Sequence, residues 1–234
     1  MNEQLPNTTA GMSLSVADMS RVGGLQNEQT FASVYTQNQA GRHGSITEST
    51  LDAFYLFFYS SHPFLLPRFR LREFLRQRHL PHLEAAMQYI VSLYLPAMPS
   101  ESLKQSVDEL LFRHALPRDW FAVQAMLLFA IGLHASGEPE RAGDVIHSAI
   151  RTALDIGMHR REYALENKAG CSIMEESWRR TWWELYIVDA LIAGANQNVP
   201  LRLFAVATDV ALPCEESEFV TGVSSLISGW SYFH

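Results

Sequence analysis

Residues 176–194 read ESWRRTWWELYIVDALIAG, a stretch with three tryptophans, two adjacent arginines and one aspartate. At the helical period of about 3.6 residues, Trp178, Trp182 and Asp189 fall on one side. A narrow polar edge comprises Glu176, Arg180 and Glu184. A helix that is apolar on nearly all sides is usually buried within a larger helical assembly. The stretch therefore predicts a buried, tryptophan-rich helix at the centre of an all-α domain.

Asp189 lies on the apolar side of this predicted helix. An isolated carboxylate in a protein core costs several kcal/mol unless it is paired or accepts hydrogen bonds. We expect an arginine from another helix, or buried amide donors, to meet it. On this interpretation Asp189 fixes the position of the helix, and Asp189→Ala destabilises the domain by about 3–5 kcal/mol. The alternative is a ligand-sensing carboxylate in an internal pocket.

The tryptophans of this helix have two interpretations of the same kind. Packing in the core is the first, and forming the wall of a small-molecule pocket is the second. The structural or regulatory candidates in this helix are Trp178, Arg180, Trp182, Trp183 and Asp189.

Helical spacing of apolar residues recurs on the N-terminal side of this stretch, and no strand pattern appears. The predicted helices lie at about 47–62, 68–79, 81–94, 101–114, 120–135, 139–156 and 173–193. The pair 120–135 and 139–156 is joined by Gly137-Glu138-Pro139, which predicts antiparallel neighbours. Gly157 and Gly194 are expected to end their helices. The fold class expected is all-α, an irregular multi-helix domain of antiparallel helical hairpins around the tryptophan-rich helix.

Three segments follow from this pattern. Residues 1–46 are polar without a helical or strand period, which predicts a disordered N-terminal segment. Residues 47–218 form the predicted helical domain. Residues 219–234 are interpreted as a truncated or incomplete C-terminal segment, whose apolar residues, including Trp230 and Phe233, predict self-association.

Composition excludes several kinds of site and partner. The net charge of −7 argues against binding nucleic acid with the general surface, and no apolar run is long enough for a membrane span. Only two cysteines are present, Cys171 and Cys214, so four or more thiolates cannot surround zinc. No secretory signal opens the sequence, which favours an intracellular protein. We expect no catalytic residues, no bound cofactor and no metal site in this chain.

Two stretches could suggest binding chemistry. His79, His82 and Glu84 lie close in sequence, but Pro81 interrupts their helical face, so the start of a surface helix is the favoured interpretation. The arginines between residues 68 and 78 could form a localisation signal or a phosphate-contacting strip. The interleaved Phe and Leu residues favour an amphipathic helix with a solvated basic face.

Four motifs, in order along the chain, resemble the fungal-specific transcription factor domain, the middle homology region of zinc-cluster regulators. They are YLFFYSSHPFLL at 55–66, the apolar helix at 120–133, AIRTALDIGMHR at 149–160, and ESWRRTWWELYIVD at 176–189. DVALPC at 209–214 resembles a further family segment. Two features depart from the family pattern: residues 195–201 replace its Gly-Arg-Pro-like turn, and the cysteine-rich zinc cluster is absent.

The resemblance implies a regulatory domain that acts in the nucleus and that, in some family members, responds to metabolites. DNA would be reached only through a missing module, which would carry any zinc, or through a partner protein. Other transcription regulators and a small-molecule effector are the further candidate partners. Two alternatives from other classes stay open. A tetratricopeptide-like scaffold would need its hairpin at least three times and shows it once, and an all-α enzyme acting on an apolar molecule would need convergent acid–base groups.

Overall fold

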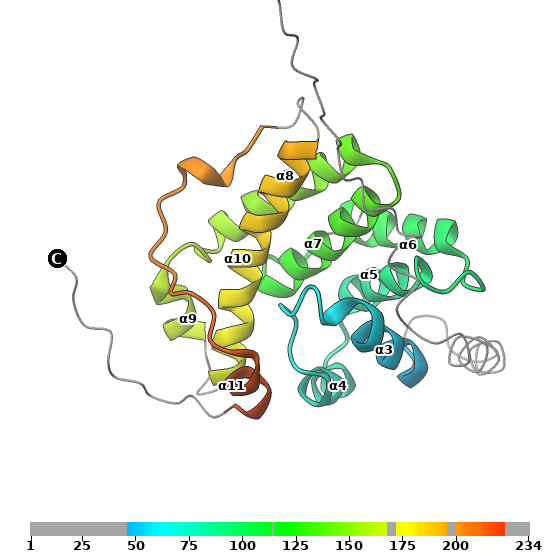
Figure 1. Ribbon diagram of the computed structural model, residues 1–234, viewed down its shortest axis with the longest axis horizontal. Helices are drawn as coiled ribbons and strands as arrows, with labels where there is room; N and C mark the ends of the chain where they lie inside the picture. The colour runs from blue at the N-terminus through cyan, green and yellow to red at the C-terminus, as the bar shows by residue number, and fades with distance from the viewer. Residues whose placement is uncertain (1–45, 114, 168–171, 196–199, 223–234) are drawn as a thin grey trace, which may run out of the picture.

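The computed structural model describes residues 46–113, 115–167, 172–195 and 200–222. This part of the chain is helical and contains no strand, which confirms the all-α class (Figure 1). Its α-helices are α3 (Glu48–Phe54), α4 (Arg68–Gln77), α5 (Pro81–Ser92), α6 (Ser100–Phe112), α7 (Trp120–Ala135), α8 (Pro139–Asp155), α9 (Arg161–Asn167), α10 (Ser172–Ala195) and α11 (Glu216–Thr221). A π-helical segment (Tyr55–Tyr59) continues α3, and a 3-10 turn (Leu203–Ala205) follows α10.

The centre of the fold is α7 rather than the tryptophan-rich helix. Every residue of α7 from Trp120 to Ala130 is buried, and α7 packs against α5, α6, α8 and α10. Figure 1 shows α7 between α5 on one side and α10 on the other. Its apolar residues surround the whole helix, and such a helix is stable only when neighbours cover all of its faces.

The tryptophan-rich helix α10 is covered only in part. Ile187 is 58% exposed and Leu191 is 52% exposed, whereas Trp178, Trp182 and Asp189 are buried. The helix packs against α7, α8 and α9. The expected polar edge was also wrong in part, because Glu176 and Arg180 are buried. Tertiary contacts determine which residues of a helix are buried. When apolar residues occur on all sides, the helical period does not predict which of them these are.

The prediction for α7 and α8 agrees with the observed bounds to within one residue. These two helices form the most extensively packed pair of the domain and are connected by three residues. Gly137 and Gly157 adopt φ angles of 80° and 82°, the left-handed region that favours glycine after a helix. Gly194 does not end α10, which continues to Ala195.

A close contact between α7 and α5 gives a prediction for Gly132. A Cβ atom at Gly132 would lie 2.5 Å from Cε1 of Tyr89, a fully buried ring whose hydroxyl forms a hydrogen bond with Ser136 directly after α7. Overpacking of this kind costs about 1–3 kcal/mol, which exceeds the roughly 0.5–1 kcal/mol that alanine gains over glycine in a helix. We therefore expect Gly132→Ala to lower the free energy of unfolding, measured by denaturant titration.

Gly194 is the matched control, because a Cβ atom there meets nothing within 4 Å. Gly194→Ala should leave stability unchanged or raise it by up to about 1 kcal/mol. Equal stabilities for the two variants would contradict the assigned contact between α7 and Tyr89.

The sequence pattern missed two short helices, α9 and α11, and was wrong about the exposure of one helix start, which it placed correctly at Pro81. His82 and Glu84 at the beginning of α5 are buried rather than on the surface, and Glu84 Oε2 accepts the amide of Ile46 at 2.8 Å. The boundary expected at residue 218 lies inside α11, where Phe219 is buried. Short helices such as these depend on their tertiary contacts, since isolated helices of this length are unstable. The segments 1–45 and 223–234, and the self-association expected from the latter, lie outside the described residues.

Candidate functional site

Residues 200–215, here called the strap, run beside α10 from its C-terminal end to α11 (Figure 1). Apart from one 3-10 turn, the strap has no regular secondary structure. Side chains of α10 bind it at three levels: Asp189 at one end, Trp183 in the middle, and Glu176 with Arg180 at the other end. Four of the polar groups in the tryptophan-rich motif therefore hold a segment that follows it in sequence.

Asp189 is fully buried and binds the start of the strap. Its Oδ2 atom accepts the backbone amides of Arg202 and Leu203, each at 2.8 Å. The donors are thus buried amides, and the arginine considered from the sequence does not occur here. Within the described ranges Oδ1 accepts no hydrogen bond. A carboxylate that accepts two backbone amides stays in a core at far lower cost than an unbonded one.

Arg180 joins four parts of the domain at the other end of the strap. Its Nε donates to Glu176 at 2.9 Å, and its terminal nitrogens donate to Glu216 of α11 and to the carbonyls of Pro63 (3.2 Å) and Cys214 (2.8 Å). The guanidinium also lies 4.3 Å above the ring of Phe219 in α11. Only the planar, five-donor guanidinium group can serve acceptors in so many directions. Glu176 in turn accepts the Cys214 amide at 2.8 Å.

Trp183 and two residues of the strap complete the attachment. Trp183 is half-buried, and its indole N–H donates to the Ala211 carbonyl at 2.8 Å. Thr208 donates to the carbonyl of His159, and Asp209 accepts the amide of Arg161 at the start of α9, both at 2.8 Å. The strap therefore connects α10 to the turn after α8 and to α9.

Cys214 is half-buried beside Glu176. Burial, together with the charge of Glu176, raises the pKa of its thiol to about 11. A thiol with such a pKa is protonated at neutral pH and is a poor nucleophile. No group of three or more potential metal ligands occurs among the residues placed by the structure.

The loop that carries the His62-Pro63 pair is held to α10 by further polar contacts. His62 Nδ1 lies 2.6 Å from Glu184, and the His62 ring stacks on Phe58. Deeper in the core, the Phe64 carbonyl accepts hydrogen bonds from Ser177 at 2.9 Å and from Gln124 at 3.3 Å. This loop, α7 and α10 therefore meet through buried polar groups that have partners.

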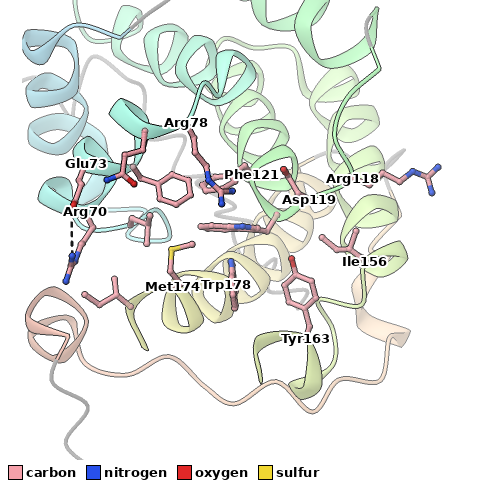
Figure 2. A pocket seen from close by; sticks show the side chains of 15 residues that line it. Arg70, Glu73, Arg78, Arg118, Asp119, Phe121, Ile156, Tyr163, Met174 and Trp178 are labelled. Atoms are coloured by element: carbon pink, nitrogen blue, oxygen red, sulfur yellow. Dashed lines mark ion pairs between the residues drawn. The ribbon is translucent and has the colours of Figure 1, made fainter. Parts of the chain in front are cut away.

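A cleft of about 720 Å³ lies between α4 and the N-terminal half of α10 (Figure 2). Its aromatic and apolar walls include Phe74, Trp120, Phe121, Tyr163, Met174 and Trp178. Of the tryptophans singled out from the sequence, Trp178 lines this cleft; Trp182 and Trp183 do not. Nothing in the sequence marked Phe74, Phe121 or Tyr163 as neighbours, because they come from α4, α7 and α9 and meet only in the folded chain.

The arginine-rich helix α4 is largely neutralised by acidic residues. Arg72 lies 2.6 Å and Arg76 lies 3.2 Å from Glu48 in α3, and Arg68 forms an ion pair with Asp52. Exposed ion pairs of this kind contribute little stability, but they reduce the positive charge that a phosphate would meet. The helix is amphipathic with a solvated basic face, as the sequence indicated: Leu71 is its buried residue.

Comparison with known proteins identifies the family. A family model described as "Fungal specific transcription factor domain" matches residues 51–228. The chain is also 38% identical over 179 residues to the C6 finger domain transcription factor iacK of Pestalotiopsis fici (strain W106-1 / CGMCC3.15140). That match covers 76% of the chain and 27% of the relative, so the chain spans little more than a quarter of the relative's length. No solved structure matches. Because the family model covers most of the chain, including α10 and the strap, this protein belongs to the fungal-specific transcription factor domain family.

Proposed function

We propose that the chain is a non-catalytic regulatory domain of a zinc-cluster-type transcription factor, and that it acts in the nucleus to restrain activation. One observation carries the proposal. Three motifs characteristic of the family, the His62-Pro63 loop, the α10 helix and the segment before Cys214, meet at the single guanidinium of Arg180. These contacts join the helices and the strap into one unit. A domain that restrains a neighbouring activation segment needs such a unit.

A reporter assay tests this role. The full chain is placed between a heterologous DNA-binding module and an activation segment in a fungal host, with a flexible linker of equal length as the control. We expect the chain to lower reporter output, and Arg180→Met to relieve that restraint because it separates the three motifs. Equal reporter output from the chain and the linker, at equal nuclear protein levels, would refute the proposal.

The same proposal makes a prediction about DNA and zinc. The chain has two cysteines, two lysines and a net charge of −7, and the arginines of α4 are paired with acidic residues. Sequence-specific DNA binding needs side chains that contact the base edges in a groove. The described residues show no helix or ribbon that presents a set of unpaired basic side chains in this way. We expect the 234-residue chain alone to show no sequence-specific DNA binding and no stoichiometric zinc.

Competition titrations and metal analysis measure both properties. Discrimination between one duplex and scrambled competitors at near-physiological salt would contradict the first expectation, as one tightly bound zinc per chain would contradict the second. On this proposal, DNA is reached through a zinc-cluster module or a partner protein, and other transcription regulators are the further partners.

No helix in the described segments has the length and apolar character needed to cross a membrane.

A further inference from the structure

We propose that the cleft between α4 and α10 binds an aromatic small molecule that carries a carboxylate. The proposal deepens the regulatory role proposed above, for which such a ligand would be the effector. It rests on the proposed function only for its consequence in transcription, because binding can be measured on the isolated chain.

The size and the walls of the cleft suit a small molecule. A volume of about 720 Å³ lies inside the range of roughly 300–1,000 Å³ that small-molecule sites occupy. The aromatic walls are held in place by contacts with one another. The rings of Trp120 and Trp178 meet edge to face at 5.5 Å, and Tyr163 meets Trp178 in the same way at 5.6 Å. Rigid aromatic walls of this kind favour a flat apolar ligand.

The charged groups of the cleft favour an anion. Glu73 lies 3.5 Å from Arg70, and Arg118 lies 3.5 Å from Asp155 outside the cleft. Asp119 accepts the Ala122 amide at the start of α7. These carboxylates and two of the arginines therefore already have partners.

Arg78 differs from the other arginines of the cleft. No acidic group within the described ranges forms an ion pair with it, and its guanidinium lies 5.0 Å from the centre of the Phe74 ring. In Figure 2 Arg78 reaches toward Phe121 and the interior of the cleft, whereas Arg118 points away. A guanidinium over an aromatic wall matches a carboxylate attached to an aromatic body, because it can bind both oxygens.

Trp178 supplies a second donor without a partner. Its side chain is 3% exposed, and no acceptor among the described residues bonds its indole N–H. In Figure 2 the ring nitrogen of Trp178 points toward the middle of the cleft. The Arg78 guanidinium and the Trp178 N–H are both donors, and the side-chain amide of Gln77, which also lines the cleft, can donate as well as accept. These groups favour a ligand that carries acceptors.

A matched pair of probes tests the proposal on the full chain. Pyrene-1-butyrate and pyrene-1-butanol share one aromatic body and differ in the carboxylate. Energy transfer from tryptophan to pyrene measures binding, since Trp120 and Trp178 line the cleft. We expect the acid to bind with a stoichiometry of one and about tenfold more tightly than the alcohol, the difference expected from one charge-assisted hydrogen-bonded pair. High salt should weaken the binding of the acid and leave the binding of the alcohol unchanged.

Three variants locate the site. Arg78→Met should remove the preference for the acid over the alcohol. Met174→Trp fills part of the cleft and should weaken the binding of both probes. Arg113→Met is the control, because Arg113 is an exposed arginine directly after α6 and outside the cleft. Each variant is first checked for a wild-type melting temperature.

Equal affinities for acid and alcohol would overturn the proposal, as would no binding of either probe at about 100 μM, where even weak specific ligands are detected. A preference for the acid that survives Arg78→Met would overturn it too. None of these results would change the reporter assay. Conversely, binding without restraint in the reporter would refute the regulatory function and leave the site intact.

Discussion

Asp189→Ala is expected to lower the free energy of unfolding by about 3–5 kcal/mol, because it removes a buried charged acceptor that two backbone amides share. The substitution leaves the amides of Arg202 and Leu203 without an acceptor, and Leu203 is fully buried. Water cannot easily replace the carboxylate at a buried amide, so the penalty is not recovered. The measurement is equilibrium unfolding of the full chain in urea.

Two further variants separate the hydrogen bonds from other effects. Asp189→Asn retains an oxygen that can accept the amides but loses the charge, so we expect about half of the loss. Asp144→Ala removes an exposed carboxylate from α8 and should change stability by no more than about 0.5 kcal/mol.

The strap should also become more accessible in Asp189→Ala. Trypsin cleaves after arginine, and Arg202 lies where the strap is held by Asp189. We expect faster cleavage at Arg202 in the variant than in the wild type under native conditions. A free energy of unfolding within about 1 kcal/mol of the wild-type value, together with an unchanged rate of cleavage at Arg202, would contradict the assigned role of Asp189.

Arg180→Met is the second change with a large expected effect, a loss of about 3–5 kcal/mol in the free energy of unfolding. Arg180 is 7% exposed, and its removal takes from the buried carboxylate of Glu176 one of its two cations. It also leaves the carbonyls of Pro63 and Cys214 without this donor. Arg180→Lys should restore little of the loss, because one ammonium group cannot reach acceptors on four sides.

The adjacent residue provides the control for Arg180. Arg179 lies on the same helix and forms ion pairs with Glu175 and Glu176, but its side chain is 20% exposed. Arg179→Met should therefore cost about 1 kcal/mol or less, since solvent screens such pairs. If Arg179→Met and Arg180→Met lower the free energy of unfolding by similar amounts, the buried position of Arg180 does not add to stability.

Local patterns determined much of this architecture. The all-α class, the bounds of α7 and α8, and the left-handed Gly157 were predictable because helical period, helix-opening prolines and glycine conformation depend on residues within a few positions of one another. The family was recognisable for a related reason: its motifs are short, and each is contiguous in the sequence. The period of α10 also placed Asp189 on the same side as Trp178 and Trp182, and all three are buried.

Tertiary structure decided which side of each helix is covered and what the buried polar groups bind. The apolar residues of α10 occur all round it, so the period could not show that Ile187 and Leu191 are exposed while Glu176 and Arg180 are buried. The partners of Asp189 lie 13 and 14 residues further along the chain and are backbone amides, which carry no side-chain signature. The cleft beside Trp178 needs side chains from four helices, and only packing of those helices brings them together.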